Sequence, residues 1–356
     1  MSELSREARD ARIEETSPRG APARREARDE AAGREAAGPG LSLNVRALAI
    51  VDDMVANRDE LRIAERRLES GARVIDAGVE AAGGLRAGLA LASVCMGGLG
   101  HVDFTSVAIE GEFMPGVQVW TDHPAVSCMA SQYAGWAIKV EQFFAMGSGP
   151  LRAHACVERE LFAKLGYVER AERGVLALES RIFPGDDVAR WVAGRCRLDP
   201  AGLTFVVAPT ASLAGTVQVV ARVLETGLHK MDALGFDVTR VVSGIGTAPL
   251  PPVAKDDLRA IGRTNDCILY GAQARYTVRA EDDELRDLAR RLPASASGDY
   301  GTPFYETFKR YGGDFYKIDP LLFSPAEVWL TSATSGRTFH GGRTNLGVLK
   351  ASLYES

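Results

Sequence analysis

The segment Gly215-Thr-Val-Gln-Val-Val-Ala-Arg-Val-Leu-Glu-Thr-Gly-Leu-His-Lys-Met231 carries the most informative pattern in this chain. It is mostly apolar, and the spacing of its apolar residues predicts a helix. Its strongly polar residues before the last turn are Gln218, Arg222, Glu225 and His229. At about 100° per residue they fall within a sector of roughly 60°, which we call the polar stripe. A helix that is apolar on its other sides belongs in a core, so the polar stripe predicts the wall of a cleft.

Two charged residues of the polar stripe, Arg222 and Glu225, stand three positions apart. The spacing alone fits a structural ion pair as well as a functional one. A buried ion pair adds little net stability after desolvation, which leaves room for a functional reason. A carboxylate beside an arginine is expected to stay ionised, and it can then polarise a water for attack on a cationic carbon.

Composition sets the broad class of the protein. The 356 residues suffice for one large domain or two ordinary ones, with 46% hydrophobic and 25% charged residues. A net charge of −5 argues against nucleic acid or an anionic membrane as partner, and no apolar run is long enough to span a bilayer. The five cysteines are widely spaced and form no C-x-x-C pair, which predicts a reduced, cytoplasmic protein.

The chain divides into a charged start and a folded remainder. Residues 1–40 are rich in Arg, Glu, Asp and Ala, and they are predicted to form a disordered N-terminal tail. Beyond them, helical and strand patterns mix without a regular βαβ period. We therefore predict an irregular α/β (α+β) subunit, neither Rossmann nor TIM barrel.

Local patterns predict individual elements within this frame. Helices are expected over residues 44–67, 127–140 and 150–165. A further helix is expected over Asp186–Cys196, and Leu203–Ala208 reads as a buried strand that leads into the polar-stripe helix.

Several chemical motifs are absent. There is no G-x-G-x-x-G opening a helix, no Walker loop and no G-x-S-x-G. The five histidines stand apart from one another, so no metal site is expected.

Two polar loops offer binding groups instead. Ser148 and Gly149 precede a helix that carries Arg152, so backbone N–H groups and a guanidinium could hold an anion. An ordinary turn with a helix cap is the alternative for this loop. In the loop 121–124, Asp122 and His123 are further candidates, although a histidine before a proline is more often a capped loop residue.

A family resemblance runs through the folded part of the chain. The segments that carry it are CMGGLGHVD (95–103), TDHPA (121–125), SQYAGW (131–136), FFAMGSGP (143–150), VAPTASLAGTVQ (207–218), ARVLETGLHKM (221–231), GRTNDCILYGA (262–272) and the stretch 299–328. In this order, from about Leu41 to Tyr354, they resemble methenyltetrahydromethanopterin cyclohydrolase. Tyr133 departs from the pattern, because archaeal members often have Lys there, and this bears on contacts with the anionic tail of the pterin.

The resemblance implies a subunit of two α/β domains, residues 41–200 and 201–356, with the catalytic helix in the second and the substrate cleft between them. It also implies a homo-oligomer, with a trimer favoured, and a reaction without metal or cofactor. That reaction is the hydration of a methenyl-tetrahydromethanopterin to its formyl derivative, and its small-molecule pterin substrate is the expected partner. The family's catalytic Glu, three residues after an Arg, maps onto Glu225, with Arg222 beside it. From the cleft helix and the loop positions, the expected substrate-binding residues are Gln218, His229, Ser148, Gly149, Arg152, Tyr133, Asp122 and His123.

Other functions make different predictions. A non-catalytic pterin binder would keep the cleft and lose the base, and the presence of Glu225 speaks against it. A transferase of phosphorylated small molecules would use the loop and helix start at 147–152. A folate-specific cyclohydrolase in its common bifunctional form would carry a dinucleotide-binding glycine motif, which this sequence lacks.

Overall fold

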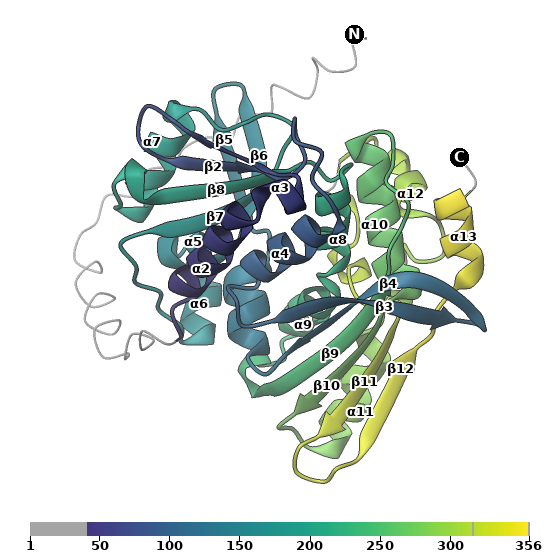
Figure 1. Cartoon of the computed structure of the whole chain (residues 1–356). Coiled ribbons are helices and arrows are strands. Elements are labelled where there is room, and N and C mark those ends of the chain that lie inside the picture. Colours follow the sequence, from purple (N-terminus) through teal and green to yellow (C-terminus); the bar gives the residue numbers. More distant parts are fainter. Residues whose placement is uncertain (1–40, 315–316, 355–356) are drawn as a thin grey trace. The chain divides into compact units, whose positions relative to one another are not determined.

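A computed structural model describes residues 41–314 and 317–354, all within one compact unit. The predicted disordered tail, residues 1–40, lies outside the described residues. The fold contains two six-stranded sheets, sheet A in the order β1-β2-β8-β7-β6-β5 and sheet B in the order β12-β11-β10-β9-β4-β3 (Figure 1). The predicted class, an irregular α/β fold without a barrel, is confirmed.

The strands are bounded as follows: β1 Ala64–Arg67, β2 Arg73–Asp76, β3 His101–Ile109, β4 Glu112–Thr121, β5 Trp136–Val140, β6 Phe143–Ser148, β7 Gly174–Glu179, β8 Leu203–Ala208, β9 Val241–Pro249, β10 Gln273–Val278, β11 Glu327–Ser332 and β12 Thr338–Gly342. The α-helices are α2 Leu43–Ala56, α3 Arg58–Leu61, α4 Leu85–Cys95, α5 Pro150–Ala155, α6 Arg159–Leu165, α7 Asp186–Cys196, α8 Leu213–Val220, α9 Val223–Ala233, α10 Asp257–Gly271, α11 Asp282–Arg291, α12 Phe304–Arg310 and α13 Leu346–Tyr354. A π-helix, η4, covers Ala125–Gln132, and short 3₁₀ turns cover η5 Pro200–Gly202, η6 Val238–Arg240, η7 Ala294–Ala296 and η9 Pro320–Leu322.

Sheet A is covered on both faces. Its central strands β2, β8 and β7 run parallel, and every residue of β8 is buried. Val206 of β8 joins a core with α2 and α4, whereas Phe205 and Val207 join a second core with α7. Because alternate side chains of a strand point to opposite faces, this continuous apolar run needs helices on both sides of the sheet.

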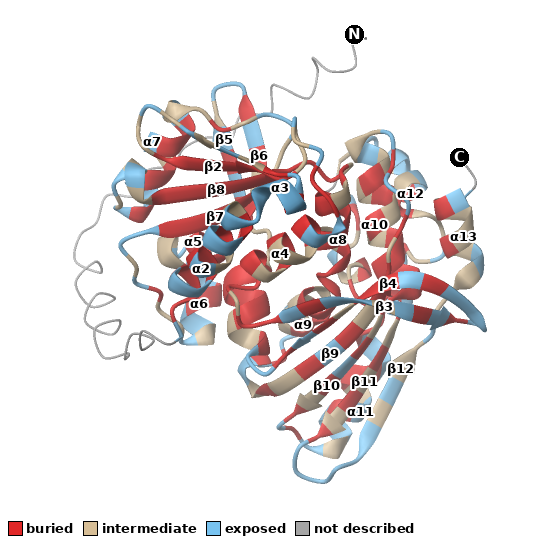
Figure 2. Ribbon diagram, viewed as in Figure 1, coloured by how far each residue is buried: buried red, intermediate tan, exposed pale blue. Residues whose placement is uncertain are grey.

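Sheet B is covered on one face only. Helix α9 packs so closely on β9 that a Cβ at Gly246 would lie 3.1 Å from the side chain of Val223. On the opposite face, Trp120, Ile245 and Arg275 stand side by side in the strand register and are exposed. We call this surface the open face of sheet B. Figure 2 shows exposed segments along the outer strands β3 and β12 of the same sheet.

Each sheet takes strands from both sides of residue 200. Sheet A includes β8 from the later part of the chain, and sheet B includes the hairpin of β3 and β4 from the earlier part. The predicted domain boundary at residue 200 therefore does not coincide with a boundary between the two sheets, and the division into two domains stays a prediction.

Two predicted elements are confirmed and several boundaries are wrong. The helix Asp186–Cys196 and the strand Leu203–Ala208 occur as predicted. The helix expected over 44–67 ends earlier, since Arg62 adopts the left-handed conformation with φ 54° and the chain turns into β1. The helix expected over 150–165 is likewise split, at Cys156 with φ 50°.

The segment 127–140 was expected to be helical throughout, and its last five residues form a strand. The π-helix η4 ends at Gln132, and β5 follows from Trp136. In β5, Trp136 and Ile138 are buried while Ala137 and Lys139 are exposed. This two-residue alternation is typical of a strand, and it is too short to stand out beside a helical segment.

The lengths and apolarity of the described helices bear on whether any of them could cross a membrane. Within residues 41–314 and 317–354, none of them combines the length and apolarity that crossing a bilayer requires.

A buried carboxyl group joins three helices at the C-terminal end of the fold. Asp266 of α10 accepts a hydrogen bond from the N–H of Phe304 at 2.8 Å and another from the hydroxyl of Ser352 at 2.5 Å. Burial raises the pKa of Asp266 to about 7. The folded chain therefore holds a proton here over a pH range in which the unfolded chain, with a carboxyl pKa of about 4, has lost it.

We predict that this site makes the protein less stable as pH rises from about 4 to about 7. In that window the folded state binds more protons than the unfolded state, so the free energy of unfolding falls, by at most about 1.4 kcal/mol per pH unit. Asp266→Asn should lack this fall, and urea unfolding of both proteins at pH 5 and pH 8 measures it. The exposed Asp103→Asn serves as control. Parallel pH dependence in wild type and Asp266→Asn would contradict the prediction.

Candidate functional site

The helix that carries the polar stripe is broken in the middle. Helix α8 ends at Val220 and α9 begins at Val223, with Ala221 and Arg222 in a turn between them. The side-chain amide of Gln132 donates to the carbonyl oxygen of Ala221 at 3.1 Å. A side chain that inserts into the hydrogen-bond ladder is a recognised cause of a helix break. The single predicted helix is therefore corrected to two, with Arg222 at their junction.

The guanidinium of Arg222 is the most connected group near the polar stripe. Arg222 is only 6% exposed. It donates through Nη1 to the carbonyl oxygen of Gln132, and through Nη2 to Gln218 Oε1 at 3.0 Å and Ser148 Oγ at 3.2 Å. Its charge is paired with Glu179, with Nη2 3.3 Å from Oε1. The predicted residues Gln218, Ser148 and Arg222 thus come together.

Glu179 is a site residue that the sequence analysis missed. It is the last residue of β7 and half-buried, and besides Arg222 it accepts a hydrogen bond from Gln218 Nε2 at 3.0 Å. The carboxyl ends of parallel strands in α/β sheets are common sites for ligands. A polar residue at the end of the apolar run 174–178 was the signal that could have found it.

The carboxylate of Glu225 stands apart from this network. Glu225 lies in the first turn of α9 and is 5% exposed. Within the described part of the chain, it makes neither a hydrogen bond nor an ion pair. Burial raises the pKa of Glu225, although the charges of Arg222, His229 and Arg152 act to lower it. The expected direct ion pair between Glu225 and Arg222 is therefore wrong, because Arg222 pairs with Glu179 instead. The expectation that the neighbouring arginine keeps Glu225 ionised is also corrected, because burial affects the pKa of Glu225 more than Arg222 does.

A stack of two rings and a guanidinium includes two of the groups whose charges act on Glu225, His229 and Arg152. The rings of Tyr133 and His229 stack with centroids 4.8 Å apart, at an angle of 28°. Arg152 lies beyond Tyr133, with Cζ 5.1 Å from the ring centroid. The structure thus brings together three more of the predicted residues.

The groups that were expected to hold an anion already have partners in the chain. Arg152 is fully buried, pairs with Glu158 and donates to the carbonyl oxygen of Met129. The N–H of Gly149, where φ is 101°, donates to the carbonyl oxygen of Ser131 at 2.8 Å. A substrate-binding role for Gly149 and Arg152 stays a prediction, and these contacts describe a structural role for both.

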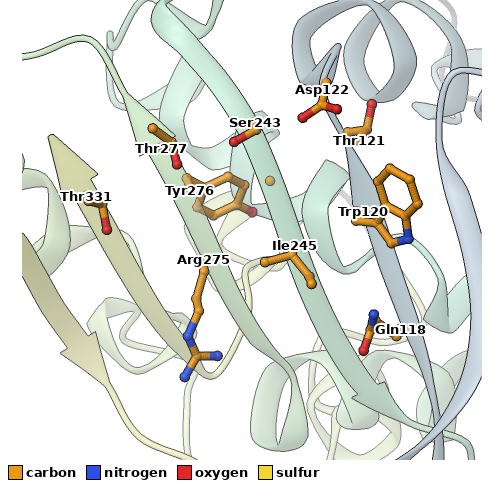
Figure 3. A pocket seen from close by; sticks show the side chains of 11 residues that line it. Gln118, Trp120, Thr121, Asp122, Ser243, Ile245, Arg275, Tyr276, Thr277 and Thr331 are labelled. Carbon is orange, nitrogen blue, oxygen red and sulfur yellow. The ribbon is translucent and has the colours of Figure 1, made fainter. Parts of the chain in front are cut away.

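Asp122 and His123 lie elsewhere. Both are exposed in the loop after β4, and no hydrogen bond, ion pair or ring contact between described residues joins them to the Arg222 network. Asp122 lines a hollow of about 430 Å³ on the open face of sheet B, together with Trp120, Ile245 and Arg275 (Figure 3). Neither Arg222 nor Glu225 lines this hollow.

The chemistry that the site offers is acid–base chemistry. In the part of the chain that the structure covers, no group of three or more His, Cys, Asp or Glu side chains is placed to hold a metal ion. A buried carboxyl without a partner gains its charge most readily when a cation binds beside it. Glu225 is therefore suited to take a proton from water next to a cationic ligand.

Comparison with known proteins identifies the family of this chain. The family model described as Cyclohydrolase (MCH) matches residues 42–353. A methenyltetrahydromethanopterin cyclohydrolase of Methylobacillus flagellatus is 48% identical over 312 residues, which cover 88% of this chain and 95% of the relative. Proteins of the same name from Xanthobacter autotrophicus and Methanococcoides burtonii are 45% identical over 309 residues and 42% identical over 314. These cover 86% and 88% of this chain, and 90% and 98% of the relatives.

The matched range leaves out only the residues before 42 and the last three, and it contains the whole network around Arg222 as well as Glu225. The chain belongs to the Cyclohydrolase (MCH) family.

Proposed function

We propose that this protein hydrates the methenyl bridge of a methenyl-tetrahydromethanopterin, giving the formyl derivative. Water adds to the methenyl carbon, one carbon–nitrogen bond breaks, and one proton is released. The substrate is a cation with its positive charge delocalised around the reacting carbon. The reaction therefore needs a group that accepts a proton from water and that favours a cation beside it.

The observation that carries the proposal is the state of Glu225. Its carboxyl group is buried, it has no partner among the described residues, and its pKa is raised by burial. A bound methenyl cation would favour the ionised form, so the base would gain its charge beside the electrophilic carbon. The carboxylate would then take the proton of the attacking water.

Arg222 has a supporting role in this mechanism. Four side-chain or backbone oxygen atoms of the chain hold its guanidinium in one place. From there its charge stabilises the ionised Glu225, and it offers a fixed positive group as negative charge develops on the attacking oxygen. Tyr133 and His229, already stacked on each other, provide an aromatic surface for the flat pterin ring.

We predict that Glu225→Gln lowers kcat by about 10²- to 10⁴-fold, since the amide cannot accept the proton of water. The decay of the methenyl-pterin absorbance on adding purified protein measures the rate. Glu284→Gln, which changes a carboxylate on the surface near Arg240, is the matched control and should keep the wild-type rate.

Two other results would change the assignment. Similar rates in wild type and Glu225→Gln would keep the reaction and remove Glu225 as its base. Binding of the methenyl-pterin without any turnover by the wild type would instead identify a non-catalytic pterin-binding protein.

We propose further that the reaction uses neither metal nor redox cofactor. Adding water to the methenyl carbon does not change the oxidation state of that carbon, so no electron acceptor is required. Dialysis against EDTA should leave the rate of methenyl-pterin hydration unchanged. Loss of activity that returns on adding a divalent cation would contradict this part of the proposal.

A homo-oligomer in the cytoplasm completes the proposal, with a trimer favoured. Trp120 and Ile245 on the open face of sheet B are 38% and 43% exposed, and such neighbouring apolar side chains are often covered in an assembly. The cytoplasmic location is supported by the five cysteines, which are all free thiols, as is usual for proteins of reducing compartments. For a chain of 38.2 kDa, light scattering should give three times that mass, and the mass of a single chain would contradict the oligomer.

A further inference from the structure

Two carboxylates lie near Arg222, and only one of them touches it. Glu179 Oε1 is 3.3 Å from Arg222 Nη2, while Glu225 makes no ion pair with any residue in the described ranges. Glu179 also accepts from Gln218 Nε2 at 3.0 Å, and Gln218 Oε1 in turn accepts from Arg222. The three side chains close a ring of hydrogen bonds.

This ring fixes the direction of the guanidinium. Arg222 is 6% exposed, so its charge needs a carboxylate, and leaving a buried charge unpaired is costly. Glu179 comes from the end of β7, on the sheet A side, whereas Glu225 lies in α9, which packs on sheet B. An arginine at the junction of α8 and α9 can turn to either, and the ring with Gln218 turns it to Glu179.

We propose that Glu179 is a positioning residue, which holds Arg222 in an ion pair and so withholds part of its positive charge from Glu225. This inference rests on the proposed function of Glu225 as the base. A base that is fully paired with an arginine would be a weak proton acceptor, because its pKa would be low. A base beside an arginine that another carboxylate neutralises keeps a higher proton affinity.

The charges around Glu225 agree in direction with this role. Arg222, His229 and Arg152 lower the pKa of Glu225, and Glu179 raises it. The pKa of Glu225 is raised overall because the effect of burial is the largest. The titratable and charged groups that face Glu225 are Arg222 and His229 from its own segment, Arg152 from α5, Glu179 from β7, Cys128 from η4 and Tyr276 from β10.

The test is the pH at which Glu225 ionises in wild type and in Glu179→Gln. The amide keeps the shape and the contact with Gln218 while removing the charge. Arg222 is then free to act on Glu225, so the midpoint should move down by about one pH unit. The acid limb of the pH profile of kcat/KM measures this midpoint in the enzyme.

A second readout does not depend on turnover. The carboxyl stretching band of protonated Glu225 can be followed with pH in infrared difference spectra against Glu225→Gln. If the wild type shows no turnover, the proposed function fails, while this titration still tests Glu179. A midpoint that is unchanged or higher in Glu179→Gln would overturn the inference, even if kcat falls at every pH.

Two controls separate this role from a loss of folding. Glu327→Gln removes another half-buried carboxylate, paired with His340 on sheet B, and should leave the midpoint unchanged. If Glu179→Gln leaves Arg222 unpaired and the chain unfolds, the double variant with Arg222→Gln restores the charge balance. Because Arg222 affects the Glu225 pKa more than Glu179 does, the midpoint of the double variant should lie at or above that of the wild type. A midpoint below it would overturn the inference.

Discussion

The arrangement of the site depends on where one buried guanidinium finds its partners. Arg222 takes hydrogen-bond acceptors from η4, β6, β7 and α8, so it connects sheet A and the π-helix to the junction of α8 and α9. A buried arginine that lost these partners would cost about 3–5 kcal/mol, which makes their arrangement a condition of the fold as well as of the chemistry. The helix break at Ala221 belongs to the same constraint, since Gln132 donates to Ala221 O and accepts from Arg222.

This constraint gives the two acidic residues different roles. Glu179 neutralises Arg222 and is half-buried at a strand end, whereas Glu225 is more deeply buried and lacks a partner among the described residues. A carboxyl group in the second situation keeps its proton to higher pH, and the arrival of a cation favours its ionisation. The site therefore separates the carboxylate that balances charge from the one that we propose moves a proton.

Much of this could be predicted from local sequence. The periodicity of residues 215–231 placed Gln218, Arg222, Glu225 and His229 on one side of a helical segment, because side-chain direction follows from spacing. The run Leu203–Ala208 was recognisable as a buried strand for the same reason. The partner of Arg222 could not be predicted in this way, since Glu179 is 43 residues away and meets it only through the packing of β7 against the elements around α8. The wrong helix boundaries have another cause. Arg62 and Cys156 adopt left-handed backbone conformations, which cannot be predicted from an arginine or a cysteine in the sequence.

The most direct test of this account is a crystal structure of Glu225→Gln with the methenyl-pterin bound. The account predicts that the methenyl carbon lies beside residue 225 with space for one water between them, about 3–3.5 Å from each. It also predicts that Arg222 remains paired with Glu179. A substrate bound instead in the hollow lined by Trp120, Ile245 and Arg275 on the open face of sheet B would contradict it.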